Sequence, residues 1–319
     1  MALETEAVLD RRALKRRAGL WRAVAILAFL LAAGAIAHML EIGTSTPRHV
    51  ARVSIDGFIS DDRRQQQLLK RIAENDQVRA LLLSINSTGG STTGGEALFE
   101  SIRAVAEKKP VVAQFGTVAA SAAYIAGLAA DHIVARGNTI TGSVGVIFQW
   151  PEVSGLLDKL GVKVNEVKSG NLKAVPSLFQ PEDAEGRKVT EEFVNESQRW
   201  FVALVRDRRK VDTAAIPGLE QGRIYSGREA LQHNLIDSIG GEAEALRWLE
   251  AEHKIPASTR VMDWRPRSST TLLGALAQAF AGLAGGAGGE VLSTFSEASG
   301  LAQRVMLDGL LSVWQPYEK

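Results

Sequence analysis

Short apolar runs of strand length alternate with amphipathic, helix-like stretches over the middle of the chain. The strand-like runs are VARVSI (50–55), RALLLSI (79–85), VVAQF (111–115), HIVAR (132–136) and VKVNEV (162–167). Residues 61–75, 95–108 and 182–209 have polar and apolar positions at helical spacing. Strands that alternate with helices are typical of an α/β domain with a largely parallel sheet, and we expect this domain to span residues 49–255.

The first 40 residues differ from the rest, because a basic stretch precedes an apolar one. Six Lys and Arg residues lie between positions 11 and 22, and residues 23–37 are apolar. Residues 20–40 are long enough for one transmembrane helix, with the basic flank in the cytoplasm and the later domain on the opposite side. A cleavable signal peptide that ends at Ala35-Ile36-Ala37 and a buried soluble helix are the alternatives.

The chain therefore divides into five predicted parts. They are a basic cytoplasmic N-terminus (1–19), a transmembrane anchor (20–40), a linker (41–48), the α/β domain (49–255) and an apolar, Gly-rich tail (256–319). The tail is apolar from Leu272 to Leu283, but glycines interrupt it soon after, so it is a poor membrane span. Its composition fits packing on a neighbouring subunit, lying on the membrane surface, or threading toward an active site.

The composition excludes several classes of function. The 319 residues are 45% hydrophobic and 23% charged with a net charge of +1, so we expect a globular protein without a nucleic-acid partner. The sequence has no cysteine, and its five histidines are far apart, so we expect neither disulfides nor a catalytic metal. Any nucleophile must then be an oxygen or a nitrogen.

Two segments place small residues where an enzyme needs access to its own backbone. In INSTGGSTTGGEA (85–97), Gly89 and Gly90 follow a strand-like run, and their N–H groups can point at a developing oxyanion. A plain glycine turn between a strand and a helix is the simpler interpretation. A phosphate-binding loop is disfavoured because the segment lacks the lysine of that motif.

The second segment, FGTVAASAAYIAG (115–127), places Ser121 at the predicted start of a helix. Alanines on both sides leave room for a bulky acyl group. The unpaired N–H groups of the first helical turn, including that of Ala122, can complete an oxyanion hole. A serine at this position is also a common helix N-cap, so the segment alone leaves both interpretations open.

A serine nucleophile needs a base within hydrogen-bond reach. His132 follows the whole helix that Ser121 opens, about 15 Å away, and is a poor geometric partner. A lysine can take this role where an apolar pocket lowers its pKa to about 7 or 8. The candidates are Lys168 and Lys173 in VKSGNLKAVPSLFQP (167–181), and their surroundings alone do not decide between them.

Together these segments resemble the signal peptide peptidase A family, the serine-lysine peptidases of the Clp protease and crotonase fold. The resemblance runs from about Val50 to Glu252 and lies in motifs that occur in the family's order. They are INSTGG, GTVAASAAY, TGSVGVI (141–147), VKSGNLK and GRIYSGREALQHNLIDSIGG (222–241). The resemblance implies an α/β fold of repeated ββα units with an N-terminal transmembrane helix and a C-terminal tail. Thr88, Ala122 and Ala123 replace the family's usual proline and glycines.

The resemblance also implies a role for individual residues. Carried over by position, Ser121 would be the nucleophile and Lys173 the general base. The oxyanion donors would be Gly89, Gly90 and Ala122, and Ser143 would orient the lysine. The choice of Lys173 over Lys168 comes from the family's motif. The resemblance implies no metal and no other cofactor.

The implied activity is endopeptidase cleavage of remnant signal peptides in the bacterial inner membrane. The single-pass anchor would hold the catalytic domain on the periplasmic side. The implied partners are peptide substrates, membrane lipid and further copies of the chain in a ring, in which two subunits can build one site. A stomatin-type membrane-protein peptidase, a crotonase-like acyl-CoA enzyme and a non-catalytic membrane scaffold are the alternatives.

Overall fold

The computed structural model describes residues 17–22, 24–30, 32, 34, 47–266 and 310–313. The chain forms two compact units, Met1–Pro47 and Arg48–Lys319. In the first unit, residues 17–22 and 24–30 are helical. None of the helices formed by the described residues has both the length and the hydropathy of a membrane span. Part of the predicted anchor, including residues 35–40, lies outside the described residues.

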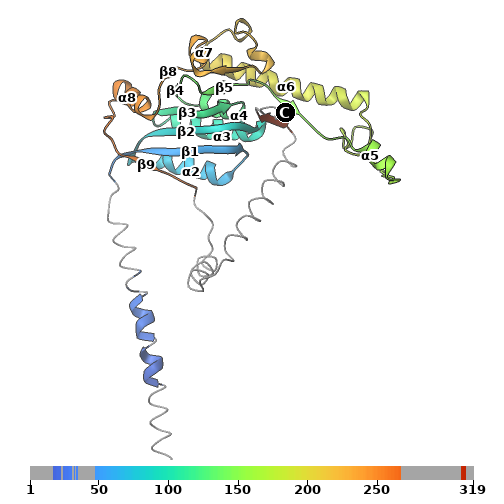
Figure 1. The fold of residues 1–319 in the computed structure, drawn as a ribbon. Coiled ribbons are helices and arrows are strands. Elements are labelled where there is room, and N and C mark those ends of the chain that lie inside the picture. The colour runs from blue at the N-terminus through green and yellow to red at the C-terminus, as the bar shows by residue number, and fades with distance from the viewer. Residues whose placement is uncertain are drawn as a thin grey trace, which may run out of the picture. The chain divides into compact units, whose positions relative to one another are not determined.

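The second unit is built around one mixed sheet. Its strands are β1 (His49–Ile59), β2 (Val78–Ser91), β3 (Val111–Ala120), β4 (His132–Ala135), β5 (Ile140–Gly142), β6 (Ile147–Phe148), β7 (Ile224–Ser226), β8 (Ser238–Ile239), β9 (Val261–Asp263) and β10 (Leu310–Val313). Its helices are α2 (Arg63–Glu74), α3 (Thr92–Ala106), α4 (Ala122–Leu128), α5 (Ser154–Lys159), α6 (Ala184–Arg209), α7 (Gly227–Gln232) and α8 (Glu242–His253), with short 3-10 turns at Thr213–Ala215 and Leu219–Gln221. The alternation of strands and helices confirms the predicted α/β class (Figure 1).

Parallel pairing dominates the sheet. β1 lies between β9 and β2, and β3, β4 and β8 follow on the other side of β2, all of them parallel. β5 runs parallel to the carboxyl end of β3, and β7 is antiparallel to β5. β10 is antiparallel to both of its neighbours, β2 and β6. The carboxyl ends of β2, β3 and β5 therefore meet at one edge of the sheet.

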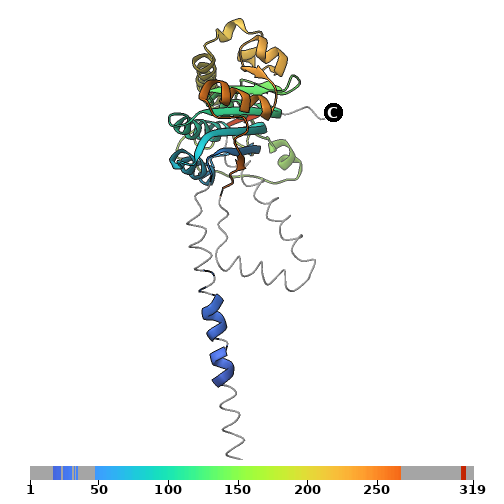
Figure 2. The ribbon, with the colours of Figure 1, turned by 90° about the vertical axis from the view of Figure 1, so that its left-hand side faces the viewer.

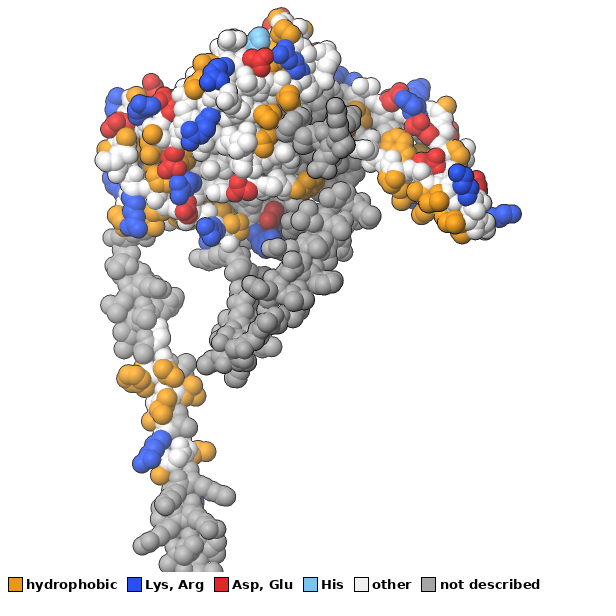
Figure 3. Space-filling model, in the orientation of Figure 1, with side chains coloured by type: hydrophobic (Ala, Val, Ile, Leu, Met, Phe, Trp, Pro, Cys, Tyr) orange, Lys and Arg blue, Asp and Glu red, His pale blue; other side chains and the backbone are white. Residues whose placement is uncertain are grey.

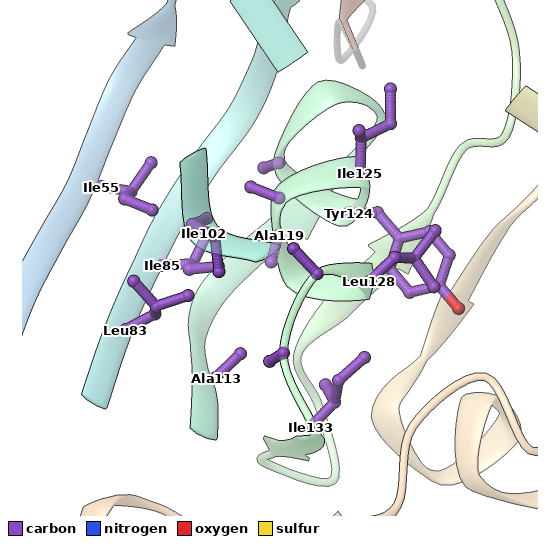
Figure 4. Close-up of a cluster of buried hydrophobic side chains, with 14 of the residues drawn as sticks. Ile55, Leu83, Ile85, Ile102, Ala113, Ala119, Tyr124, Ile125, Leu128 and Ile133 are labelled. Atoms are coloured by element: carbon purple, nitrogen blue, oxygen red, sulfur yellow. The ribbon is translucent and has the colours of Figure 1, made fainter. Parts of the chain in front are cut away.

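Helices cover both faces of this sheet (Figures 1 and 2). On one face, buried side chains of α2, α3, α4 and α6 pack on residues of β1, β2 and β3. Figure 4 shows part of this cluster, with Leu83 and Ile85 of β2 near Ile102 of α3. On the other face, Leu249 of α8 lies in a second buried cluster with Val112 of β3 and Val134 of β4. Burial of each such side chain stabilises the fold by about 1.5–3 kcal/mol. The two layers of helices together therefore hold the sheet rigid.

β2 is longer than the sequence pattern predicts. The strand-like run ends at residue 85, yet β2 continues through Gly89 and Gly90 to Ser91. There the Ser91 side chain accepts from the N–H of Gly94 (3.1 Å) and caps α3. Both glycines pair with the end of β1, so a neighbouring strand compensates for their low strand propensity. The simpler interpretation, a plain turn between a strand and a helix, therefore does not describe residues 89–91.

Residues 162–167 form no strand, which contradicts the expectation from their alternating pattern. They belong to a segment between β6 and α6, residues 149–183, which we call the projecting segment. In Figure 1 it extends away from the sheet and carries α5. A strand needs a neighbour to complete its hydrogen bonds, and within the described ranges no other strand pairs with residues 162–167.

The projecting segment is rich in exposed hydrophobic side chains. They are Leu156, Leu160, Val162, Val164, Val167, Leu172, Leu178 and Phe179. Figure 3 shows hydrophobic side chains gathered over this part of the molecule. An apolar surface of this kind is typical of a region that another molecule covers.

Gly127 of α4 is tightly packed, whereas Gly155 of α5 faces open space. A Cβ on Gly127 would lie 2.4 Å from Cζ of the buried Phe115, and a Cβ on Gly155 would have no atom within 4 Å. We expect Gly127→Ala to lower the free energy of unfolding by about 1–3 kcal/mol. Gly155→Ala should leave it unchanged or raise it by up to about 1 kcal/mol. Urea unfolding measures both, and equal effects would contradict the close packing of α4 on β3.

Candidate active site

Ser121 occupies the turn between β3 and α4. Its N–H donates to the carbonyl of Gly142 in β5 (2.9 Å), and its own carbonyl accepts from Ile125 in α4 (3.0 Å). The residue is fully buried, and its side chain makes no capping hydrogen bond to the helix. Ser121 therefore holds the N-cap position without performing the capping role that serine usually has there.

The backbone of Ser121 is strained. Its φ is +60° and its ψ is −123°. Glycine adopts this region readily, whereas other residues adopt it at a cost on the order of 1–3 kcal/mol. The hydrogen bond to Gly142 and the complete burial of α4 hold the residue in this conformation. Strain of this kind concentrates at functional sites.

The glycines of β2 lie beside Ser121. β2 and β3 pair in parallel as far as Ser87 opposite Ala119, and Gly89 and Ser121 each follow the last paired residue of their strand by two positions. Gly89 has a φ of +120°, and its N–H donates to the Ser87 hydroxyl (3.0 Å). A Cβ on Gly90 would lie 1.9 Å from a carbonyl oxygen of β1, so only glycine fits there.

The start of α3 packs against the start of α4. A Cβ on Gly95 would lie 3.2 Å from the Cβ of Ala122, which measures how closely the two helices approach. Ile125 is the first residue of α4 whose N–H bonds to the start of the helix. The N–H groups of the first turn, that of Ala122 among them, therefore have no acceptor within α4. They give the space beside Ser121 a positive electrostatic character.

Ser143 lies close to Ser121 through β5. Gly142 pairs with Ala120, and Ser143 follows with a φ of +52° and 8% of its surface exposed. The Ser143 N–H donates to the carbonyl of Arg223 (2.9 Å). The structure thus brings the two serines, the β2 glycines and the start of α4 to the same edge of the sheet.

Two arginines that the sequence analysis did not single out hold the far end of α4. Arg208 of α6 donates to the carbonyls of Leu128 (2.7 Å) and Ala130 (2.9 Å), and Arg103 of α3 donates to the carbonyl of Ala129 (2.8 Å). Guanidinium groups at a helix C-terminus satisfy its last carbonyls and favour its dipole. Sequence spacing does not indicate these bonds, because α3 and α6 meet α4 only in the folded domain.

Tyr124 fixes the middle of α4. Its buried hydroxyl donates to the carbonyl of Leu235 (2.8 Å). Burial raises the pKa of the Tyr124 hydroxyl well above its ordinary value, so the group remains a neutral donor at physiological pH. The helix that follows Ser121 is therefore anchored along its length.

Lys173 lies in the projecting segment and is exposed. Its N–H donates to the carbonyl of Gly170 (3.0 Å), and its side chain forms no ion pair or hydrogen bond with any described residue. Lys168, in contrast, pairs with Glu166, with Nζ 2.7 Å from Oε2. Within one chain, no described contact joins Lys173 to Ser121.

His132 lies at the opposite end of β3 from Ser121. It pairs with Val112 near the start of β3, whereas Ser121 follows the end of that strand. Its Nε2 lies 3.0 Å from Oγ of Ser238, and burial lowers the pKa of its imidazole. Across the described parts of the chain, no three His, Asp or Glu side chains group together as a metal site requires.

Comparison with known proteins gives two family matches and several relatives. Residues 103–256 match peptidase family S49, and residues 52–138 match the Clp protease family. A provisionally named protease of Methanocaldococcus jannaschii is 35% identical over 60% of this chain and 61% of its own length. A provisionally named protease of Synechocystis is 32% identical over 64% of this chain and 74% of its own length. A provisionally named signal peptide peptidase SppA of Enterococcus faecium is 35% identical over 69% of this chain and 68% of its own length.

These matches cover the site described above. The S49 match contains Ser121, Ser143 and Lys173, and the Clp match contains Gly89 and Gly90 as well as Ser121. The chain spans 61% to 74% of the length of these three relatives. The sheet therefore has a Clp protease-like fold, and the chain belongs to peptidase family S49 and is a serine peptidase.

Proposed function

We propose that the chain is a serine endopeptidase in which Ser121 is the nucleophile and Lys173 is the general base. Neutral Lys173 takes the proton of Ser121, and the alkoxide attacks a peptide carbonyl. The protonated lysine then delivers that proton to the leaving amine. Water, activated by the same lysine, hydrolyses the acyl-enzyme and restores the serine. Each step moves a proton among lysine, serine, water and substrate, so the chain needs no metal or other cofactor.

The position of Ser121 is the observation that carries this proposal. A buried serine at positive φ, which does not cap its helix, holds a strained backbone conformation that lowers the stability of the fold. Such a residue is expected where a hydroxyl must meet its substrate at a fixed angle. Anchoring of α4 by Arg103, Arg208 and Tyr124 fits this requirement, because it limits how far Ser121 can move.

Backbone N–H groups of Gly89, Gly90 and Ala122 are the proposed oxyanion donors. The register of β2 against β3 and the unpaired first turn of α4 support them. The N–H of Gly89 donates to a serine hydroxyl, a neutral acceptor that a charged oxyanion would outcompete. Ser143, next to the Gly142 carbonyl that holds Ser121, is proposed to hydrogen-bond Lys173 and orient its amine.

Lys173 is proposed to reach Ser121 from a second copy of the chain. In one copy the lysine is exposed on the projecting segment, whereas Ser121 is fully buried. The exposed hydrophobic side chains of the projecting segment offer a surface that a neighbouring copy can bury. Burial there would give the amine the apolar surroundings that the mechanism needs. Repetition of the contact around a closed ring would complete every site.

Remnant signal peptides are the proposed substrates. The relative from Enterococcus faecium bears the name of a signal peptide peptidase. A predicted anchor at residues 20–40 would tether the domain to lipid on the periplasmic side of the inner membrane. Cleavage of stomatin-derived peptides in preference to signal peptides would favour the stomatin-type alternative. Membership of a peptidase family disfavours an acyl-CoA enzyme, and we expect no binding of CoA.

The strain at Ser121 can be measured without any substrate. Both Ser121→Gly and Ser121→Ala remove the hydroxyl, but only glycine relieves the positive φ. We expect the glycine variant to be more stable than the alanine variant by about 1–2 kcal/mol in urea unfolding. Both variants should be inactive. Equal stabilities would mean that the turn is not strained.

The two lysines of the projecting segment provide a matched test of the base. We expect Lys173→Ala to lower kcat/KM for a peptide substrate by about 10²–10⁴-fold, because the serine loses its proton acceptor. Lys168→Ala removes a partly exposed ion pair with Glu166, worth about 0–1 kcal/mol, and a long hydrogen bond to Gln180 (3.4 Å), so its kcat/KM should change less than about fivefold. The base is misassigned if the order of the two effects is reversed, or if Lys173→Ala keeps the wild-type rate near pH 8.

Mixing two inactive variants tests whether the site is shared between copies. The Lys173→Ala chain supplies Ser121, and the Ser121→Ala chain supplies Lys173. After dissociation and reassembly at equal amounts, we expect activity at about one quarter of the wild-type level, since random neighbours complete that share of sites. Failure to recover activity in a confirmed mixed oligomer would place both residues of each site in one chain.

A further inference from the structure

One polar side chain interrupts the buried face of α6. The residues of this face that pack in the core are Phe201 and Val205, and both are fully buried. Gln198 precedes Phe201 by three positions and Val205 by seven, so it lies on the same side of the helix. A glutamine on such a face is uncommon, because its amide must find hydrogen-bond partners there. The mechanism proposed above does not use this residue.

The amide nitrogen of Gln198 joins two loops. Its Nε2 donates to the carbonyl of Val144 (3.1 Å) and to the carbonyl of Glu220 (3.0 Å). Val144 is fully buried in the β5–β6 loop (residues 143–146), and Glu220 lies in the loop before β7 (residues 218–223). Since one nitrogen binds both carbonyls, α6 holds the two loops at a fixed distance from each other.

These two bonds determine which way the amide of Gln198 faces. A rotated amide would place Oε1 against two carbonyl oxygens, neither of which can donate a hydrogen bond. In the observed orientation Oε1 is buried, and none of the residues that the structure describes donates to it. The Gln198 side chain therefore binds its surroundings through its nitrogen, and the contact with the two carbonyls is what the residue contributes.

The β5–β6 loop carries Ser143. This residue adopts a positive φ of +52°, which is unfavourable for serine, and its N–H donates to the carbonyl of Arg223 in the loop before β7 (2.9 Å). A Cβ on Gly145 would lie 3.4 Å from Cα of Gly222. The two loops therefore approach each other both before and after Val144, and the amide from α6 binds both loops between these two contacts.

We propose that Gln198 is a positioning residue for catalysis, which holds the carbonyl of Val144 and so fixes the Ser143 hydroxyl where it orients the amine of Lys173. This inference rests on the proposed function, because that function gives Ser143 its place beside the lysine. An amine held at one angle accepts a proton more efficiently than one that is free to rotate. Since two carbonyls occupy the amide nitrogen of Gln198, its effect on catalysis is expected to pass through Ser143.

A double-mutant cycle tests this route in the full-length chain. Gln198→Met keeps the approximate length of the side chain and removes both hydrogen bonds. We expect it to lower kcat for a peptide substrate about five- to tenfold and to leave KM within about twofold, because the loss concerns proton transfer. In the Ser143→Ala background, where no hydroxyl remains to be positioned, the same change should lower kcat less than about twofold. Equal effects in the two backgrounds would overturn the proposal.

Gln114 of β3 supplies the matched control. It is also a partly buried glutamine whose Nε2 donates to a backbone carbonyl, that of Phe115 (2.8 Å). Gln114→Met should leave kcat within about twofold of wild type. A loss as large as that of Gln198→Met would mean that any broken glutamine contact impairs the enzyme, and would overturn the positioning role.

A second variant keeps the proposal testable if Gln198→Met folds poorly. Gln198→Glu preserves the shape of the side chain, but its ionised carboxylate has no hydrogen to donate to either carbonyl. At neutral pH it should show the same pattern, a kcat about five- to tenfold lower in the wild-type background and nearly unchanged in the Ser143→Ala background. A wild-type kcat for Gln198→Glu would contradict the proposal.

Hydrogen exchange separates a failure of this inference from a failure of the proposed function. In the Ser121→Ala background, which needs no activity, the amide of Ser143 should exchange faster with Gln198→Met than with Gln114→Met. Equal exchange would show that Gln198 does not hold the β5–β6 loop and would overturn the inference. Wild-type hydrolysis by Ser121→Ala would instead sink the proposed function and leave the exchange result standing.

Discussion

The N–H of Ser121 donates to the carbonyl of Gly142, and this bond fixes the point at which β3 stops and α4 begins. Because the turn is fixed there, Ser121 keeps a strained backbone, and the first-turn amides of α4 are directed to one place. The same turn removes β3 from the edge of β2 at the level of Gly89. That edge becomes available to another strand. The proposed nucleophile and the proposed oxyanion donors thus follow from one arrangement of the backbone.

The domain combines a rigid part with an exposed part, and the proposed chemistry needs both. The sheet edge around Ser121 is buried and anchored through α3, α4 and α6. The projecting segment that carries Lys173 has an apolar surface exposed to solvent. If Ser121 and Lys173 must come from two copies, a single copy has no complete active site, and catalysis would require assembly of the copies.

The order of strands and helices could be predicted from the sequence, because the hydrophobic periodicity of 50–136 is determined locally. The sequence alone did not show that β2 continues through its glycines, because the partner that stabilises this end, β1, lies about 30 residues earlier. The expected strand at 162–167 has no described partner within the chain. The position of Ser121 followed from its motif, but its strain depends on Gly142, a contact between distant segments. No local pattern indicates the pairing of β10, for the same reason.

The central claim is that the hydroxyl of Ser121 is the reacting nucleophile, and covalent trapping tests it most directly. The full-length protein would be incubated with a fluorophosphonate under conditions in which it hydrolyses peptides, digested, and analysed by mass spectrometry to locate the adduct. The account predicts one adduct, on Ser121, that forms in step with the loss of activity and is absent after Lys173→Ala. An adduct on another residue that accompanies the loss of activity, or inactivation without modification of Ser121, would contradict it.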